Sequence, residues 1–139
     1  MSTRKSAVVP QSHSKPIGRY SPGVRLTVTP GTELVFISGQ VATDDQGTVL
    51  FPGDAAGQAR VVFQRLEQVL EAAGGSLADL VSVNVYLTDV RGDFPAVSRV
   101  RDEVLTDPPP ASVLLEVSAL AEEGCVVEIS GLAAVGGGA

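Results

Sequence analysis

The chain has 139 residues, which is enough for a single domain with one hydrophobic core. Its formal net charge of −6 opposes binding to nucleic acid or to an anionic membrane, because either polyanion would meet a repulsive field. A single cysteine excludes an internal disulfide, and one cysteine with one histidine leaves too few ligands for a zinc site, so we expect no metal or other cofactor.

The hydropathy of the chain predicts neither membrane insertion nor export. No apolar run approaches the roughly 20 residues that a membrane span needs. The N-terminus has charged residues but lacks the apolar segment that is typical of a secretory signal. We therefore expect a cytoplasmic protein.

The first part of the chain predicts a leader followed by three strands. Residues 1–16 mix Ser, Lys, Gln and Pro without periodicity, so we expect a flexible leader. Apolar residues at strand spacing, separated by turn sequences, then predict strands at residues 24–29, 34–38 and 48–50.

A helix and a strand follow. Asp54 is a good N-cap, and the apolar residues after it keep helical spacing as far as Ala73. Gly74-Gly75 ends this helix. Residues 81–88 alternate apolar and polar side chains, which indicates a strand with one buried face.

The last third of the chain predicts a second helix and two strands. Asp93 is expected to cap the helix, with Pro95 in its first turn. The inner stripe of this helix is mostly apolar and consists of Phe94, Val97, Arg101, Val104 and Leu105. Three successive prolines forbid its continuation. Strands at residues 112–118 and 126–134 complete the domain, and residues 136–139 are expected to form a flexible tail.

The element order β-β-β-α-β-α-β-β predicts an α+β sandwich of six strands, with two helices on one face of the sheet. The strands nevertheless carry apolar residues of both parities, such as Leu114 between Val113 and Leu115. Because the two helices can cover only one face, the second apolar face predicts a homo-oligomer.

Three short segments carry a family resemblance: residues 17–21 (IGRYS), 36–41 (FISGQV) and 108–117 (PPPASVLLEV). Together they resemble the Rid family, also called YjgF/YER057c/UK114. The resemblance covers about residues 17–135 and implies one domain with the chorismate-mutase-like Rid fold. It also implies a homotrimer whose three sheets form a central barrel, with small-molecule pockets at the subunit clefts.

In the Rid deaminases, as the resemblance implies, the substrate is a 2-imino or 2-enamino acid. An arginine binds its carboxylate through two hydrogen bonds, a geometry that Lys or Ser cannot reproduce. Backbone groups near a Ser-Gly pair and a tyrosine of the N-terminal segment enclose the substrate, and a glutamate on the last strand positions the attacking water. Addition of water to the protonated C=N bond then releases ammonia and a 2-oxo acid.

Carried onto this chain, the resemblance matches Tyr20 to the tyrosine and Ser38-Gly39 to the Ser-Gly pair. Four other positions depart from the family pattern: Ser112 replaces the arginine, Ser130 the glutamate, Ser98 a frequent asparagine and Leu114 a frequent cysteine. Loss of a bidentate charged contact costs about 2 to 5 kcal/mol. We therefore expect weak or no 2-aminoacrylate deaminase activity.

Period-two geometry predicts the direction of side chains on the last two strands. On the first strand, the barrel side is expected to receive the even-numbered residues Ser112, Leu114, Glu116 and Ser118, and the helix side Val113, Leu115 and Val117. On the second, the helix side is expected to receive Val127, Ile129 and Gly131, and the barrel side Glu128, Ser130 and Leu132. Serines would then line the pocket where deaminases have a charged pair.

The candidate residues also have simpler interpretations. Tyr20 can cover a sheet edge, and Ser38-Gly39 can end a strand, although glycine also lets a ligand approach the backbone. Ser112 and Ser130 are better fillers than nucleophiles, because the one histidine lies in the leader and cannot activate them.

Four charged residues have two interpretations each. Glu116 and Glu128 are either solvated or interface carboxylates, or, if one is buried in the cleft, the acid or base of a reaction. Arg19 and Arg99 are either surface charges or a displaced contact for an anion, for which Arg19 is favoured because it adjoins Tyr20.

Two functions fit these residues. The first is a divergent Rid-type small-molecule enzyme that acts on an imine, enamine or related carbonyl intermediate in a specialised pathway, by hydrolysis, elimination or tautomerisation. The alternative is a non-catalytic trimeric module that binds a metabolite and reports it to a partner. The acidic balance of the chain and the lack of a catalytic histidine argue against a ribonuclease.

Overall fold

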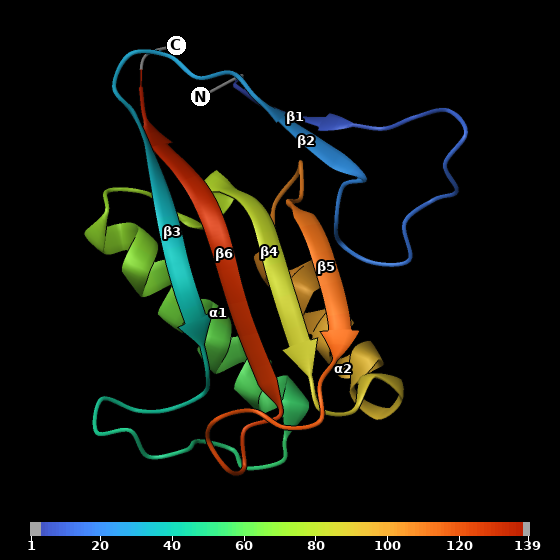
Figure 1. Ribbon diagram of the computed structural model, residues 1–139, viewed down its shortest axis with the longest axis vertical. Coiled ribbons are helices and arrows are strands. Elements are labelled where there is room, and N and C mark those ends of the chain that lie inside the picture. The colour runs from blue at the N-terminus through green and yellow to red at the C-terminus, as the bar shows by residue number, and fades with distance from the viewer. Residues whose placement is uncertain (1–3, 138–139) are drawn as a thin grey trace.

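The computed structural model describes residues 4–137. Its elements follow the predicted order of β-β-β-α-β-α-β-β, with one additional short 3-10 helix (Figure 1). Their bounds are β1 Lys5–Val8, β2 Gly23–Leu26, β3 Thr32–Gln40, α1 Ala55–Ala72, η1 Leu77–Asp79, β4 Leu80–Leu87, α2 Val90–Val104, β5 Ala111–Glu116 and β6 Val127–Gly136. The α+β class is therefore confirmed, with six strands and two long helices.

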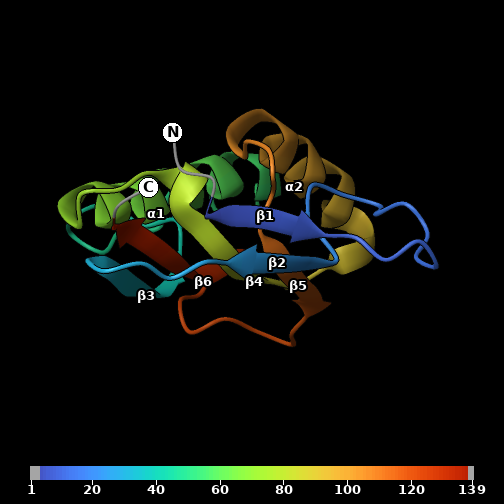
Figure 2. The same cartoon turned by 90° about the horizontal axis from the view of Figure 1, so that it is seen from above.

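The main sheet has four strands in the order β3-β6-β4-β5, so β3 and β5 are its two edges. β4 and β5 are parallel, and the other neighbours are antiparallel. Both helices lie on one face of this sheet, and the other face is bare (Figure 2). β1 and β2 form a separate antiparallel pair near the start of β5 (Figure 1).

The core fills the space between the two helices and the main sheet. α1 contributes fully buried side chains at helical spacing, among them Val62, Phe63 and Leu66, and β4 contributes Val83 and Val85. Each buried side chain of this size stabilises the fold by about 1.5–3 kcal/mol relative to an exposed one. The predicted limits of α1 are confirmed: the Asp54 carboxylate accepts the N–H of Gly57 at 3.1 Å, and the helix ends before Gly74.

Two predictions for the first part of the chain are wrong. Residues 48–50 form no strand but only a single bridge to Thr43, because the Asp44 carboxylate accepts the N–H groups of Gln46 and Thr48 and bends the chain into a turn. Instead, part of the expected flexible leader, Lys5–Val8, forms β1. Its Lys5 Nζ donates to the Ala78 carbonyl at 2.7 Å and to the Leu80 carbonyl at 2.9 Å.

The proposed divisions at residues 16 and 136 remain predictions. The first three residues of the expected leader and the last two of the expected tail lie outside the described residues. Within residues 4–137, no helix is long and apolar enough to cross a lipid bilayer.

The predicted start of the second helix is also wrong. α2 is capped by Asp89, whose carboxylate accepts the N–H of Gly92 at 3.1 Å, and Asp93 lies in its first turn. Glu116 of β5 accepts the N–H of Val90 at 3.0 Å, so two carboxylates satisfy the N-terminus of this helix. This second acceptor comes from another part of the chain, which is why the local sequence did not indicate it.

The predicted direction of side chains is right for β6 and wrong for β5. Val127 and Ile129 are fully buried beneath the helices, as predicted. On β5, Ser112 and Leu114 lie beside the buried Val83 and Val85 of β4, and so they face the helices. Val113 and Leu115, expected there, are instead 52% and 42% exposed on the bare face.

The bare face of the sheet carries exposed apolar residues on both edge strands, as the two parities of the strands predict. Besides Val113 and Leu115, it carries Leu34 and Phe36 of β3, which are 49% and 77% exposed. These exposed apolar residues are the physical reason why the predicted side-chain direction on β5 is wrong. β5 carries apolar residues on both of its faces, so hydropathy alone does not identify the face that packs against the helices.

Candidate functional site

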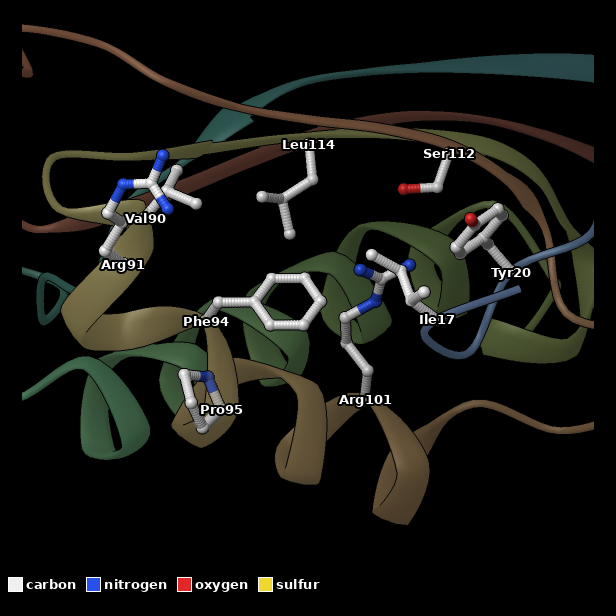
Figure 3. Close-up of a pocket in the computed structure, with 9 residues that line it drawn as sticks. All are labelled: Ile17, Tyr20, Val90, Arg91, Phe94, Pro95, Arg101, Ser112 and Leu114. Carbon is white, nitrogen blue, oxygen red and sulfur yellow. The ribbon is translucent and has the colours of Figure 1, made fainter. Parts of the chain in front are cut away.

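A cavity of about 540 Å³ lies at the β5 edge of the sheet, between that strand and α2. The chain before β2 closes one end of it (Figure 3). Its lining is apolar with a few polar groups and consists of Ile17, Tyr20, Val90, Arg91, Phe94, Pro95, Arg101, Ser112 and Leu114. A concave, mostly apolar site with a few convergent polar groups is typical of small-molecule binding.

The β5 wall of the cavity carries Ser112 and Leu114, whose side chains point towards α2 (Figure 3). The hydroxyl oxygen of Ser112 is buried and has no hydrogen-bond partner among the described residues. This serine stands where the family resemblance implies an arginine. It therefore lines a pocket as expected, but from the helix face of the sheet rather than from the barrel face.

The opposite wall carries Arg101, the most buried charged residue among the described residues, with only 2% of its surface exposed. Its Nη2 donates to the Arg19 carbonyl at 3.1 Å, and its Nε has no partner. Burial lowers the pKa of Arg101 from its ordinary value, while nearby Asp102 and Tyr20 oppose that shift. An arginine pKa is so high that the group stays charged in proteins.

Arg101 is the site residue that sequence reasoning missed. Its position in the inner stripe of α2 was predicted, but no function was attached to it. The available signal was a charged residue at an inward position between Val97 and Val104. Arg, Lys, Glu and Asp are almost never fully buried without a partner, so a charge in such a stripe is itself a functional indication.

Tyr20 lines the end of the cavity next to Ser112 (Figure 3). The backbone around it is fixed to the start of β5: the N–H of Ser21 donates to the Pro110 carbonyl at 3.0 Å, and the Ser21 hydroxyl donates to the Pro109 carbonyl at 2.6 Å. The segment with the IGRYS sequence and the triple-proline segment are thus joined directly. This contact explains why the tyrosine and Ser112 share one cavity despite their separation in sequence.

Arg19 and Ser98 lie outside this cavity, on a neighbouring shallow pocket. The Arg19 guanidinium is turned towards two acids, with Nη1 2.8 Å from Asp107 Oδ1 and Nε 3.7 Å from Asp102 Oδ1. The Arg19 side chain is thus paired with acids in this structure, and its role as a displaced anion contact stays a prediction. Its carbonyl contributes instead by holding Arg101.

The other predicted site residues form a second group on β3 and β6. The Glu128 carboxylate lies against the α-carbon of Gly39, so closely that a Cβ at residue 39 would collide with it. Ser38 precedes Gly39 on the same strand, and the Ser130 hydroxyl accepts from Asn84 Nδ2 at 3.3 Å. Glu128 and Ser130 are half-buried on the bare face of the sheet.

One chain does not bring the two groups together. The cavity belongs to the β5 edge of the sheet, and Ser38-Gly39 belongs to β3 at the opposite edge. Glu116 lies in neither group: its carboxylate accepts the N–H of Val90 at the start of α2, and its role as an acid or base stays a prediction. Within the described range, no three His, Cys, Asp or Glu side chains cluster as metal ligands would.

The electrostatic character of the cavity is positive. Two of its lining residues, Arg91 and Arg101, are cationic, and none of them is acidic. Arg91 is exposed at the start of α2, whereas Arg101 is buried in the wall. The arrangement suits a ligand that carries a negative group at one end and an apolar body that contacts Phe94 and Leu114.

Comparison with known proteins identifies the family. The family model described as Endoribonuclease L-PSP matches residues 11–135. A RutC family protein of Pyrococcus horikoshii is 34% identical over 129 residues, which cover 93% of this chain and 97% of that protein. The 3-aminoacrylate deaminase RutC of Acinetobacter baylyi is 30% identical over 131 residues, which cover 94% of this chain and 98% of that relative.

A solved structure agrees with these relatives. RidA from the Antarctic bacterium Psychrobacter sp. PAMC 21119 is 35% identical and superimposes with a TM-score of 0.68, with 96% of this chain and 97% of that chain covered. The matches span nearly the whole domain and include the three segments of the sequence resemblance. The chain therefore belongs to the Endoribonuclease L-PSP family, as a YjgF/RidA-like member of the Rid proteins.

Proposed function

We propose that this chain is a Rid-type small-molecule enzyme that acts on an imine, enamine or related carbonyl compound in clefts between the subunits of a homotrimer. We further propose that it has little 2-aminoacrylate deaminase activity. The observation that carries the proposal is the separation of the site residues into two groups on opposite edges of one sheet. A ring of copies brings the β5 edge of one subunit next to the β3 edge of another, and each cleft then holds both groups.

The exposed apolar residues of the bare face support the assembly. Leu34, Phe36, Val113 and Leu115 are 42% to 77% exposed and lie on β3 and β5, the two edge strands, on the same face of the sheet. Exposed apolar side chains at both edges of one sheet face suit an interface between copies of the chain. Three such faces around one axis form the central barrel that the family resemblance implies.

The proposed reaction uses Glu128 on one side of the cleft and the cavity on the other. Glu128 is favoured over Glu116, because its carboxylate lies against the Gly39 backbone, whereas Glu116 already accepts a helix N–H. The Glu128 carboxylate takes a proton from water as the water oxygen bonds to the C=N carbon. Because the starting C=N bond is protonated, passing this proton to nitrogen makes an ammonium group. The C–N bond then breaks and ammonia leaves, while Glu128 takes the hydroxyl proton and the C=O bond forms.

The same residues support the expectation of weak 2-aminoacrylate turnover. Ser112 offers one hydroxyl where a deaminase offers a bidentate guanidinium, and the guanidinium of this cavity comes from α2 instead. A cavity of about 540 Å³ is also much larger than a three-carbon acid requires. The enamine chemistry itself has a precedent in the family, since the Acinetobacter baylyi relative is named a 3-aminoacrylate deaminase.

The test is ammonia release by the full-length protein. Imines and enamines are generated in situ from a panel of amino acids with an amino-acid oxidase or a lyase, and the panel ranges from 2-aminoacrylate to large apolar members. We expect turnover of a larger member, a low rate with 2-aminoacrylate, and loss of turnover in Glu128→Gln. Efficient hydrolysis of 2-aminoacrylate, or full activity of Glu128→Gln, contradicts the proposal.

A non-catalytic trimeric module is the second candidate. The observation that favours it is that no residue lining the cavity is an acid or a histidine, so one chain supplies no general base there. Ligand binding by a trimer without turnover of any imine, enamine or carbonyl compound supports this alternative. Catalysis that depends on Glu128 excludes it.

A further inference from the structure

The Arg101 guanidinium is the one charged group in the wall of the cavity whose burial the rest of the protein does not explain. Its neighbours on the inner side of α2, Val97 and Val100, are fully buried apolar residues. Arg101 itself is 2% exposed, makes one hydrogen bond to a backbone carbonyl, and has an unpartnered Nε. A buried donor without an acceptor destabilises a fold, and an unpaired buried charge destabilises it more.

No acidic side chain of residues 4–137 forms an ion pair with Arg101. Asp102, the acid whose charge acts on Arg101, lies 3.7 Å from the Nε of Arg19. Arg19 contributes only its neutral carbonyl to Arg101. Apart from this electrostatic effect of Asp102, no carboxylate of the described residues pairs with Arg101, and its guanidinium lines the cavity (Figure 3).

A second unsatisfied group faces the same space. The Ser112 hydroxyl is buried without a partner and lines the cavity from β5, opposite Arg101 on α2. The Tyr20 ring lies beside them (Figure 3). Two buried polar atoms, one on α2 and one on β5, thus face one cavity without hydrogen-bond partners. A bound ligand with several acceptor oxygens would supply the missing hydrogen bonds.

From this geometry we infer that Arg101, with the Ser112 hydroxyl, binds the carboxylate of a monoanionic ligand whose apolar or aromatic body lies along Phe94 and Leu114. This ligand would be the substrate or product of the proposed enzyme, so its biological meaning rests on the proposed function. Its binding can be measured whether or not turnover occurs. The carboxylate is then held by the helix wall of the cavity and not, as the family resemblance implies, by the strand wall.

The remaining lining residues define the body of the ligand. Ile17, Val90, Phe94, Pro95 and Leu114 give the cavity apolar walls. A second full negative charge has no buried cation to pair with, since Arg91 is exposed. Arginine binds a carboxylate through two parallel hydrogen bonds, and Ser112 adds a third donor. An apolar 2-oxo acid or its imine satisfies all of these groups, whereas a short polar acid leaves most of the apolar wall in water.

The test is calorimetric titration of the full-length protein with phenylpyruvate, its methyl ester, pyruvate and inorganic phosphate. We expect phenylpyruvate to bind at least about 30-fold more tightly than its uncharged ester, which corresponds to the loss of one charged contact of about 2 kcal/mol. Pyruvate is expected to bind more weakly than phenylpyruvate because it leaves the apolar wall uncovered. Absence of phenylpyruvate binding, equal binding of the ester, or tighter binding of phosphate overturns the inference.

Two variants and a matched control make the assignment specific. Arg101→Met keeps the unbranched stem and removes the charge, and it is expected to weaken phenylpyruvate binding about 30-fold or more without lowering the thermal unfolding midpoint. Arg101→Lys, which cannot bind in bidentate fashion, is expected to restore only part of the affinity. Arg99→Met removes an exposed arginine of the same helix and is expected to leave binding unchanged.

The failures of the two proposals are distinguishable. A large loss of stability in Arg101→Met with unchanged affinity per folded molecule shows a structural arginine and overturns the inference. Normal turnover of imines by Arg101→Met also overturns it, while the proposed enzyme stands. Phenylpyruvate binding that depends on Arg101, without turnover of any imine, supports the inference and contradicts the proposed enzyme.

Discussion

At the scale of single residues, the main feature of the site is the position of its buried arginine, which lies on α2 and not on β5. Ser112 stands on the strand where the family resemblance implies an arginine, and Arg101 reaches the same cavity from the facing helix. Both have buried polar atoms without partners. The substitution at residue 112 therefore does not leave the cavity without a guanidinium. The guanidinium of the cavity comes from Arg101 on α2.

This arrangement predicts the behaviour of Ser112→Arg. Two guanidinium groups would then share one cavity, and their repulsion at about 4 Å amounts to about 1–4 kcal/mol. We expect the single variant to unfold at a lower temperature than the unmodified protein, and Arg101→Met in the same chain to relieve that loss. Ammonia release from 2-aminoacrylate is expected to rise most in the double variant.

Thermal unfolding and a coupled ammonia assay measure both effects on the same three proteins. If Ser112→Arg alone is as stable as the unmodified protein and as active as the double variant, the two side chains do not compete for one space.

A second prediction concerns the contact between Gly39 and Glu128. A Cβ in Gly39→Ala would collide with the Glu128 carboxylate, which lies at the end of a flexible side chain and can move aside. We therefore expect a small change in stability, within about 1 kcal/mol, but a large loss of turnover because the carboxylate is displaced. Gly23→Ala is the control, because its Cβ meets Val8 Cβ at an ordinary 3.5 Å.

The measurement is kcat and KM for the best substrate of the panel, beside the unfolding midpoint. Unchanged kcat in Gly39→Ala shows that the position of the Glu128 carboxylate is irrelevant to the reaction.

At the scale of elements, hydropathy predicted the limits and the buried face of an element correctly where its apolar residues form a single stripe. α1 has one apolar stripe, an Asp54 cap and a glycine stop, and its limits were predicted within about two residues. β6 has buried residues of one parity in its first half, and its inner face was predicted as well. On β5, Val113 and Leu115 cover a second apolar face, so the pattern was equally compatible with either direction.

The start of α2 shows a different limit of sequence reasoning. Asp89 and Asp93 are both good caps by type, and the local sequence favoured the one that put Pro95 in the first turn. The structure uses Asp89, with Glu116 of β5 as a second acceptor at Val90. Long-range acceptors of this kind have no local signal, and the same holds for the pairing of Lys5 with carbonyl groups before β4.

This double cap predicts a stability effect for two acidic residues. Asp89→Ala and Glu116→Ala each remove an acceptor from the α2 N-terminus, and each is expected to cost about 1 kcal/mol. For a domain of this size, 1 kcal/mol corresponds to a midpoint shift of about 2–8 °C. Glu122→Ala, an exposed acid with no hydrogen bond to a helix end, is the control.

Thermal unfolding measures these shifts. A Glu116→Ala variant that keeps its stability but loses all turnover contradicts the assignment of Glu116 to the helix end and makes it the acid or base instead.

At the scale of the whole molecule, the structure has a bare sheet face with exposed apolar residues on its edge strands, and a candidate site divided between two sheet edges. The sequence indicated the second apolar face through the mixed parity of the strands. It did not indicate that Tyr20 and Ser112 lie at one edge while Ser38 and Gly39 lie at the other, because strand order in the sheet, β3-β6-β4-β5, is not a local property. The divided site is what makes assembly a functional requirement in the proposal.

Assembly through the bare face predicts the effect of a charge placed on it. Phe36 is 77% exposed, and Phe36→Glu is expected to dissociate the trimer because each interface would bury a carboxylate without a partner. Val28→Glu is the matched control, since Val28 is 67% exposed but lies outside the main sheet.

Light scattering coupled to size-exclusion chromatography gives the mass of each variant. We expect a trimer for the unmodified protein and for Val28→Glu, and a folded but inactive monomer for Phe36→Glu. A monomeric unmodified protein with full activity excludes a shared site.

The most direct test of the helix-borne anchor is a crystal structure of the full-length protein with phenylpyruvate. We predict that the carboxylate lies within hydrogen-bond distance of Arg101 and the Ser112 hydroxyl, with the phenyl ring against Phe94 and Leu114. We also predict that Gly39 and Glu128 of a neighbouring subunit close the cleft. A carboxylate bound away from α2, or a bound ligand in a cleft that no second subunit completes, would contradict the account.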